Sequence, residues 1–470
     1  MNMQYRNFRL FSLVFALMLV LQLAACGENS SSTPTSSSVV VFSDVHFNPY
    51  YDQSLFHQLV VADTSQWAGI FKSSTLPELS KFGEDTNYPL LVLALSSIKQ
   101  NLGASPLVIF TGDILGHHFS ELFYQNLNGT QNPRDDADVA AMQAFANKTV
   151  AFFMDQVRLS AGNLPVMFAV GNDDSYNDSG PDSTFLTSTA ELFYSKLLNG
   201  TANHQEFSNT FKSGGYYSVE LAGTNLVVIG LNTVTFSTYI SGNNDSAVNA
   251  ELAWFDAKLA SAKAAGKKVW LLIHVPPGVN TYAAANSIDS NGHLATTNTA
   301  MMDKAWKEAY QTSFLQIVAK YPGLIAMTLA GHSHMDEYRI LPSSEVVEIT
   351  SSISPGSGND PAFKIFTIDL ATLKTTGYSS LNYDLVTKTL QFTTFYMFSA
   401  AYGLQGFLND SLTQLFPELY SNNAKQGLYR GYYYSGNTIG NPITTTNWPC
   451  YWCSIGRMER LDFINCVNSY

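Results

Sequence analysis

The chain has few positive charges. Its 470 residues include 25 Lys and Arg against 37 Asp and Glu, which gives a formal net charge of −12. A protein that binds nucleic acid through basic patches needs the opposite balance, so the composition argues against that class. The acidity favours solubility, and it still allows phosphate binding where metal ions supply the local positive charge.

Cysteine is also scarce, with 4 in the chain: Cys26, Cys450, Cys453 and Cys466. The three C-terminal cysteines include the pair Cys450-x-x-Cys453 but lack a fourth metal ligand, which argues against a zinc knuckle. In an exported protein we therefore expect one disulfide and one remaining thiol.

Long apolar runs are absent after the N-terminus. Residues 10–23 are nearly all apolar, but this run is short for a membrane-spanning helix. It follows Arg6 and Arg9, an arrangement typical of a signal peptide. No other stretch is long and apolar enough to span a bilayer, and the chain has no internal repeat, heptad pattern or charge run.

The N-terminus is predicted to be a targeting segment. Leu23-Ala24-Ala25-Cys26 resembles a bacterial lipobox, in which small residues fit the peptidase and Cys26 takes the lipid. We expect a lipoprotein signal peptide over 1–25 and the lipidated cysteine with a flexible Ser/Thr-rich tether over 26–38. The mature protein would then be exported and anchored to the outer membrane or cell surface. The alternative is an ordinary secretory signal and a secreted protein.

The rest of the chain predicts an α/β fold. Apolar residues make up 46% of the sequence, enough for a large core. Runs rich in Val, Ile and Leu predict buried strands over 39–42, 107–110, 166–170, 226–231, 268–273 and 325–329. Helical periodicity predicts helices over 89–102, 137–159, 185–198 and 251–265. Strands that alternate with helices indicate a layered α/β sandwich.

The residue composition and the predicted elements change after Ser354-Pro355-Gly356. We predict strands over 363–370 and 390–398. Beyond Ala401 the chain is rich in Tyr, Gly and Asn and carries no motif with recognisable chemistry. We therefore predict a catalytic domain over 39–400 and a small C-terminal helical subdomain over 401–470.

Potential metal ligands follow five of the predicted strands. They are Asp44, His46, Asp113, Asn172, His274, His332 and His334. Each of these residues alone would be unremarkable as a turn or core residue, but together they recur at strand ends, which lie along one edge of a sheet. Carboxylate, amide and imidazole donors of this kind hold two divalent cations, and paired cations hydrolyse phosphate esters.

The seven donors divide into two sets around a shared bridge. Asp113 is the natural bridge, because a carboxylate gives one oxygen to each ion. One ion would take Asp44, His46 and His334, and the other would take Asn172, His274 and His332. A metal-bridged hydroxide would then attack the phosphorus.

Five segments resemble the calcineurin-type metallophosphoesterase superfamily: Phe42-Ser43-Asp44-Val45-His46, Thr111-Gly112-Asp113, Gly171-Asn172, His274-Val275-Pro276-Pro277-Gly278 and Gly331-His332-Ser333-His334. Residues 44–51, 111–117 and 352–363 further resemble its acid sphingomyelinase-like phosphodiesterase branch. The resemblance covers residues 39–466. It implies a four-layer β-sandwich flanked by helices, Zn²⁺ at both metal positions and a disulfide between Cys453 and Cys466.

The proton donor departs from the family pattern. The family has a histidine after the motif asparagine, whereas this chain has Asp173. An aspartate donates a proton only when protonated, so His117 could act alone, activity could shift to acidic pH, or turnover could be low. The alternative is that Asp173 orients a ligand histidine.

Other residues near these motifs are weaker candidates. His118 could reach the rim of the site as well, but the spacing of His117 is the one that resembles the family. Tyr50, Tyr51, Asp174 and Tyr176 are further candidates for the substrate side of the site.

The expected substrate is a small phosphodiester or nucleotide derivative. Family members with a saposin-like domain extract phospholipids, but fewer than 20 residues separate Cys26 from Asp44. Sphingomyelin in a membrane is the alternative substrate. The alternative of another class is a catalytically weakened, metal-binding surface lipoprotein. We infer a small-molecule phosphoester partner and membrane attachment through Cys26, and no nucleic-acid or protein partner.

Overall fold

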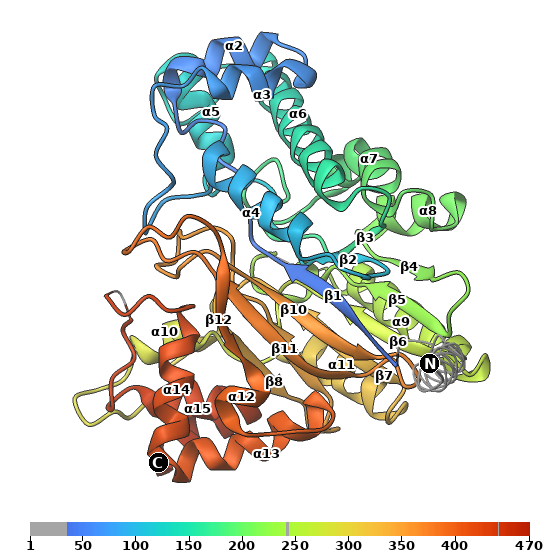
Figure 1. Cartoon of the computed structure of the whole chain (residues 1–470), viewed down its shortest axis with the longest axis vertical. Helices are drawn as coiled ribbons and strands as arrows, with labels where there is room; N and C mark the ends of the chain where they lie inside the picture. The colour runs from blue at the N-terminus through green and yellow to red at the C-terminus, as the bar shows by residue number, and fades with distance from the viewer. Residues whose placement is uncertain (1–34, 241–243, 440) are drawn as a thin grey trace, which may run out of the picture. The chain divides into compact units, whose positions relative to one another are not determined.

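In the computed structural model, the apolar runs of the sequence form the central strands of two six-stranded sheets (Figure 1). The structure describes residues 35–240, 244–439 and 441–470. The predicted signal peptide, the lipobox with Cys26 and most of the tether lie outside these residues. Among the residues that are described, no helix combines the length and apolar character needed to cross a membrane.

The first sheet carries three of the ligand-bearing strands at its parallel end. Its strands, in spatial order, are β12 (Thr393–Met397), β11 (Thr375–Asn382), β10 (Ala362–Asp369), β1 (Ser36–Phe42), β2 (Val108–Phe110) and β3 (Val166–Phe168). The strands β1, β2 and β3 run parallel in register, with Val40 opposite Val108 and Val108 opposite Val166. Their carboxyl ends therefore lie side by side.

The second sheet carries the remaining ligand-bearing strands. Its order is β4 (Tyr217–Glu220), β5 (Leu226–Gly230), β6 (Lys268–Leu272), β7 (Ile325–Ala330), β9 (Val346–Ile349) and β8 (Glu337–Ile340). The strands β5, β6, β7 and β9 are parallel. The short strands β4, β8 and β9 escaped sequence reasoning because they have only four residues each, too few to show a clear period.

Helices cover the outer face of each sheet (Figure 1). Helices α4 (Tyr88–Gln100) and α6 (Asp136–Ala161) lie over the first sheet, and α9 (Asp245–Ala264) and α11 (Glu308–Ala319) over the second. Leu252 and Phe255 of α9 share a core cluster with Val227 and Ile229 of β5. These four layers, helix, sheet, sheet and helix, confirm the predicted fold class.

Three of the predicted helices correspond closely to α4, α6 and α9. The fourth, over 185–198, is α7 (Ser183–Leu192) continued by the π-helical η2 (Phe193–Leu198). Shorter helices connect these elements: η1 (Gln53–Leu55), α2 (Phe56–Val61), α3 (Thr64–Lys72), α5 (Phe119–Asn128), α8 (His204–Gly214), η3 (Thr233–Phe236), α10 (Thr281–Ala285) and η4 (Ala300–Met302).

The C-terminal region is helical, as the composition suggested. It contains α12 (Phe398–Tyr402), α13 (Leu408–Ser421), α14 (Asn423–Tyr433), α15 (Trp448–Gly456) and α16 (Arg460–Ser469). The disulfide Cys453–Cys466 joins α15 to α16, which confirms the pairing implied by the resemblance. Cys450 is buried and free. Because α15 packs against β8 while α12 and α13 pack against β11, this region is attached to both sheets.

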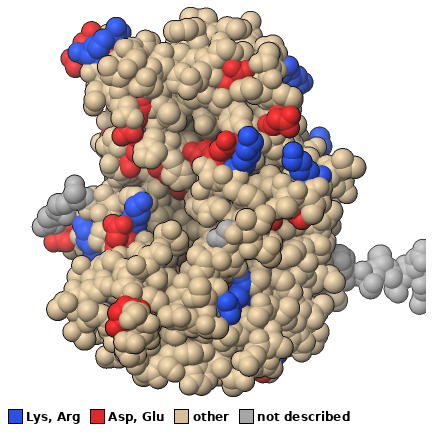
Figure 2. Space-filling view, turned by 90° about the vertical axis from the view of Figure 1, so that its left-hand side faces the viewer, with Lys and Arg blue, Asp and Glu red and all other residues tan. Residues whose placement is uncertain are grey.

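Charged side chains are sparse on the surface. Only 13% of the residues are charged, and Figure 2 shows acidic and basic groups scattered over one face of the protein without a broad area of one sign.

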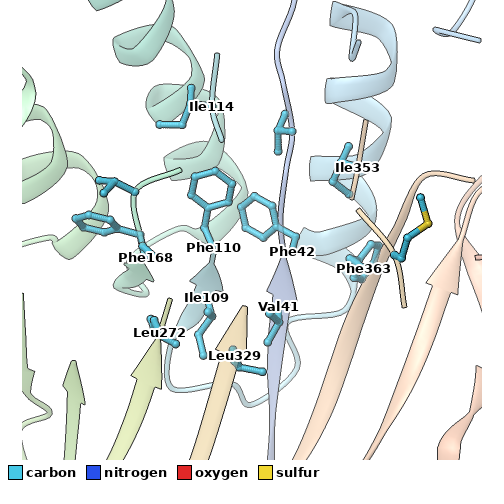
Figure 3. Close-up of a cluster of buried hydrophobic side chains, with 14 of the residues drawn as sticks. Val41, Phe42, Ile109, Phe110, Ile114, Phe168, Leu272, Leu329, Ile353 and Phe363 are labelled. Atoms are coloured by element: carbon cyan, nitrogen blue, oxygen red, sulfur yellow. The ribbon is translucent and has the colours of Figure 1, made fainter. Parts of the chain in front are cut away.

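The core between the sheets holds the ligand-bearing strands in position. Figure 3 shows Val41 and Ile109 of the first sheet near Leu272 and Leu329 of the second. Because neighbouring residues of a strand point to opposite faces, Phe110 faces the other way and packs against Phe153 of α6. Each central strand is therefore buried on both sides, which explains its continuous apolar run.

Candidate dinuclear metal site

The structure brings all the predicted metal ligands together. Asp44 and His46 follow β1, Asp113 follows β2, Asn172 follows β3, His274 follows β6, and His332 and His334 follow β7. The sequence suggested a single sheet edge. Instead, the site lies where the carboxyl ends of strands from two sheets meet.

The donor atoms of the first predicted set converge. His46 Nε2 lies 3.0 Å from His334 Nε2 and 3.5 Å from Asp113 Oδ2. Asp44 Oδ1 lies 3.6 Å from His334 Nε2. Nitrogen and oxygen ligands at about 2.0–2.2 Å from one zinc ion lie at roughly such separations from one another. These four side chains therefore fit one cation.

The second set converges on the same carboxylate oxygen. Asp113 Oδ2 lies 3.0 Å from His274 Nε2. Asn172 Oδ1 lies 3.1 Å from His274 Nε2 and 2.8 Å from His332 Nδ1. Asp113 Oδ2 therefore belongs to both sets, so this one oxygen would form the bridge. The expectation that Asp113 gives one oxygen to each ion is wrong, because Oδ1 accepts a hydrogen bond from the Asp173 amide.

Backbone carbonyls set the orientation of two histidine rings. His46 Nδ1 donates to the carbonyl oxygen of Leu115 at 3.2 Å, and His274 Nδ1 donates to that of Thr111 at 2.7 Å. A carbonyl only accepts, so Nδ1 carries a proton in both rings and Nε2 is the nitrogen that faces the carboxylates. Metal-binding histidines are held in this way.

Burial keeps three of the rings neutral. It lowers the pKa of His46 and His334 well below the ordinary value, and lowers that of His332 to about 3. A neutral imidazole is the form that binds a metal. Burial also opposes a charge on His274, but the neighbouring Asp113 carboxylate raises the pKa of this ring to about 10, so a cation that binds here replaces a proton. The donor set, with imidazole rings facing two buried aspartates, fits two divalent cations.

Five of the seven candidate ligands have a left-handed backbone. The φ angles are 47° at Asp44, 44° at His46, 63° at Asp113, 75° at His332 and 67° at His334. Residues other than glycine rarely adopt this region, and each instance costs about 1–3 kcal/mol. Such strain is typical of functional sites, where the surrounding fold imposes it.

Glycines precede Asp113, Asn172 and His332 because the segments approach too closely there for a side chain. A Cβ at Gly171 would lie 2.0 Å from Asp113 Oδ1, and one at Gly331 would lie 2.6 Å from Asp44 Oδ2. The glycine of each motif therefore has a steric cause.

Asp174 accepts hydrogen bonds from backbone amides next to Asp113 and Asn172. Its Oδ1 accepts from the Ile114 amide at 2.7 Å, and its Oδ2 accepts from the Gly171 amide at 2.8 Å. Asp174 is fully buried. The suggestion that it lines the substrate side is therefore wrong, and it holds the loops that carry Asp113 and Asn172.

The three tyrosines proposed for the substrate side also lie elsewhere. Tyr50 packs against Phe119 and Phe145 in the core. The Tyr176 hydroxyl donates to Asn147 at 2.7 Å, and the Tyr51 hydroxyl donates to Glu84 at 3.0 Å.

His117 lies against the site, and His118 does not. The His117 ring stacks on the His46 ring, with 4.0 Å between centroids. The His118 side chain is exposed and pairs with Glu121 at 3.2 Å. Of the two adjacent histidines, the structure therefore selects the one whose spacing resembles the family.

Asp85 holds His117, and sequence reasoning missed this residue. Asp85 Oδ1 lies 2.8 Å from His117 Nδ1, and Oδ2 accepts from the His117 amide at 2.7 Å. Burial opposes a charged ring, but the hydrogen bond and charge of Asp85 raise the pKa of His117 to about 9. Asp85 lies in a loop with no flanking motif, so only tertiary contact reveals it.

Asp173 lies beneath His117 and beside Asn172. Its Oδ2 accepts from Asn172 Nδ2 at 3.0 Å and lies 3.6 Å from His46 Nδ1 and 3.7 Å from His117 Nε2. Burial raises the pKa of Asp173 well above its usual range. The hydrogen bond turns the Asn172 amide so that its oxygen faces His274.

The segment after β9 joins the ligand loops of the two sheets. The Ser352 amide donates to the His334 carbonyl at 3.2 Å, and the Ser354 amide donates to the Asp44 carbonyl at 3.1 Å. These bonds give a structural reason for the resemblance seen over residues 352–363.

A cavity of about 620 Å³ opens beside the metal ligands. His117, His332 and His334 line it, together with Tyr239 and Lys304. The volume exceeds that of a lone phosphate, so the cavity has space for an organic substituent.

Known proteins resemble this chain over most of its length. Sphingomyelin phosphodiesterase B of Dictyostelium discoideum is 22% identical over 93% of this chain and 66% of its own. The human cyclic GMP-AMP phosphodiesterase SMPDL3A is 22% identical, covering 90% of this chain and 88% of its own. The human acid sphingomyelinase-like phosphodiesterase 3b is 24% identical, covering 70% and 67%.

The extent of these similarities differs. The chain spans just under two thirds of the Dictyostelium protein, 66%. A solved dimetal phosphatase of Danio rerio aligns with 74% of this chain and 96% of its own, at 11% identity and a TM-score of 0.40. No family model matches the chain. The relatives over most of the chain, together with the assembled His and Asp cluster, show that it belongs to the calcineurin-like metallophosphoesterases, in the acid sphingomyelinase-like family of metal-dependent phosphodiesterases.

Proposed function

We propose that this chain hydrolyses small phosphodiesters or nucleotide derivatives with two divalent cations, zinc at both positions. The observation that carries the proposal is the shared oxygen Asp113 Oδ2, which belongs to both donor sets. Zinc suits a set of imidazole nitrogens and carboxylate oxygens, and family resemblance also implies it.

The cations, when bound, supply a water of lowered pKa and offset the charge of the phosphate. The protein contributes the alignment. Asp113 Oδ1 accepts from the Asp173 amide at 2.8 Å, which leaves Oδ2 free for the bridge. The Asn172 amide adds a neutral donor where a carboxylate would repel an anionic substrate.

His117 is the proposed proton donor to the leaving oxygen. Its Nδ1 is held by Asp85, so Nε2 is the nitrogen left to donate a proton, from a ring that lines the cavity and lies 3.7 Å from Asp173 Oδ2. A pKa raised to about 9 keeps this proton in place at neutral pH. Asp173 then has the orienting role, through its hydrogen bond to the Asn172 amide.

The proposed substrate class rests on the size of the cavity and on the short expected tether, because fewer than 20 residues separate Cys26 from Asp44. A cavity of about 620 Å³ takes a headgroup or a nucleoside. The names of the relatives specify sphingomyelin in one case and cyclic GMP-AMP in another, so they support a phosphodiester substrate without selecting one. Sphingomyelin is the second candidate.

We also propose that the protein is an exported lipoprotein anchored through Cys26. The basic and apolar N-terminus and the lipobox-like segment support this proposal. The anchor would hold the catalytic domain, 39–400, and the C-terminal subdomain, 401–470, at a membrane surface.

A substrate panel tests the function. The purified protein is loaded with zinc and assayed on bis-p-nitrophenyl phosphate, p-nitrophenyl phosphocholine, the p-nitrophenyl ester of thymidine 5′-monophosphate and sphingomyelin in detergent. Metal content is measured on the same sample, and Asp113→Asn is the control. We expect metal-dependent turnover of the soluble diesters. A protein that binds metal and hydrolyses nothing between pH 4 and pH 9 would instead be the weakened surface lipoprotein.

A further inference from the structure

A lysine lies beside the metal ligands on a segment that the backbone fixes. Lys304 has a left-handed backbone, with φ of 59°, and its backbone hydrogen-bonds the His332 ring. Trp306, two residues further on, is fully buried. The position of Lys304 is therefore set by the same contact that orients a candidate ligand.

Tyr239 comes from another segment and lies against Lys304. The Lys304 Nζ is 5.4 Å from the centroid of the Tyr239 ring, and that ring meets the His332 ring edge-on at 5.6 Å. The Thr238 amide donates to the Ala305 carbonyl at 2.9 Å, so the two segments are joined by the backbone. Lys304, Tyr239 and His332 thus form a continuous wall of the cavity.

Among the lysine and arginine side chains of the cavity wall, Lys304 is the one available to bind an anion. Arg339 also lines the cavity, but its Nη1 lies 2.6 Å from Glu337 Oε2, and both side chains are buried. Lys304 is exposed and has no ion pair within the described parts of the chain. Asp303, its neighbour in the sequence, is not among the residues that line the cavity.

We propose that Lys304 and Tyr239 form a second-anion subsite, which binds a phosphate next to the one held at the metals. This inference rests on the proposed function, because the metal site fixes where the first phosphate lies. The ammonium group of Lys304 and the hydroxyl of Tyr239 are both donors suited to phosphate oxygens. The substrate class is then one with adjacent phosphates, such as a nucleoside polyphosphate.

The same wall disfavours a phosphocholine substrate. A trimethylammonium group binds on the face of an aromatic ring, but Lys304 already lies over the face of Tyr239. A second cation at that place would meet like-charge repulsion. The subsite therefore favours polyphosphates over zwitterionic head groups.

Calorimetry on the zinc-loaded protein tests the subsite. The probes are AMP and α,β-methylene-ADP. The second carries one additional phosphonate group, joined by a methylene bridge that resists hydrolysis. We expect the wild type to bind α,β-methylene-ADP about tenfold more tightly than AMP, the range of one charged hydrogen-bonded contact. Lys304→Met should reduce this ratio to about one, and Tyr239→Phe should reduce it partly.

Lys263→Met is the matched control, because Lys263 Nζ lies over the Tyr321 ring at 5.6 Å, outside the residues that line the cavity. Its ratio should equal that of the wild type. A wild type that does not prefer α,β-methylene-ADP, or a Lys304→Met protein that keeps the preference, would overturn the subsite. Failure of the proposed function is distinguishable, because it appears as absent turnover of every phosphodiester while the binding ratio is still measured.

Discussion

The rings of His117 and His46 are stacked, with 4.0 Å between their centroids and 12° between their planes. One ring is a candidate metal ligand and the other is the proposed proton donor. Burial, and next the charge of His117, lower the pKa of His46, which keeps the ligand ring neutral. The stacking therefore couples the two roles, since the protonated ring helps to keep its neighbour deprotonated.

Asp85→Asn should slow the reaction most for poor leaving groups. The variant keeps the shape of the side chain but removes the charge that raises the pKa of His117 to about 9. Loss of general acid catalysis costs about 10²-fold or more for an alkyl leaving group. The loss should be small for p-nitrophenolate, which leaves without protonation. Equal losses for both substrates would contradict the positioning role.

The pH dependence of Asp85→Asn follows from the same shift. A raised pKa keeps His117 protonated up to about pH 9, so the wild type should lose activity only above that pH. In the variant the alkaline limb should move to lower pH, because the proton leaves His117 more readily. The pH profile of kcat/KM for a slow leaving group measures this, and Asp155→Asn on the exposed face of α6 is the control.

Chelation of the metals should destabilise the fold. The two buried aspartates and the left-handed ligand backbones are favoured when cations occupy the site. A ligand present at 100 times its Kd stabilises the native state by about 2.7 kcal/mol. We expect EDTA to lower the melting temperature by several degrees and readdition of zinc to restore it. An Asp113→Asn protein that responds equally to EDTA would show that the effect lies elsewhere.

Asp173→Ala should weaken metal binding at the position of Asn172. Without the acceptor Asp173 Oδ2, the Asn172 amide is free to rotate away from His274. Loss of such an outer partner typically costs about 10–100-fold in metal affinity. Metal titration followed by elemental analysis measures the change.

Asp173→His distinguishes the two possible roles of Asp173, catalytic acid or orienting partner of Asn172. If Asp173 takes the acid role, restoring the family histidine should raise the rate and change the pH optimum. If Asp173 orients Asn172, the pH optimum should stay and metal affinity should fall. The orienting role is the one we expect.

Gly171→Ala should abolish the site. The added Cβ would lie 2.0 Å from Asp113 Oδ1, inside the bridging carboxylate. We expect loss of bound metal and a large drop in stability, measured by elemental analysis and thermal unfolding. Gly69→Ala is the control, because that helical position has open space around it. It should stabilise the protein by about 0.5–1 kcal/mol.

Cys26→Ser should release the protein from membranes. Without the thiol no lipid is attached, and the apolar run over 10–23 is short for a membrane-spanning anchor. After expression in a bacterial host and fractionation, the variant should appear in the soluble exported fraction. A variant that still sediments with membranes would refute the lipoprotein proposal.

The sequence alone determined the ligand set and the fold class. Each ligand follows a continuous apolar run, and a buried strand has this local signature, so residues such as Asp113 and His274 could be placed before any contact was known. The disulfide pairing of Cys453 with Cys466, which the structure confirms, and the choice of His117 also came from local spacing and resemblance. The lipobox at Cys26 stays a prediction.

Tertiary structure decided how the ligands are supported. Asp85, Tyr239 and Lys304 have no motif around them, and each contacts a partner far away in the chain, as Asp85 contacts His117. Asp174 follows a motif, but its contact with the Ile114 amide could not be predicted from the sequence. The sequence also could not predict that the site is divided between two sheets. The apolar pattern of a strand predicts that the strand is buried, but it does not indicate which element packs against it. Local periodicity records what each segment must bury, whereas the partners of a buried polar group are chosen only when distant segments pack together.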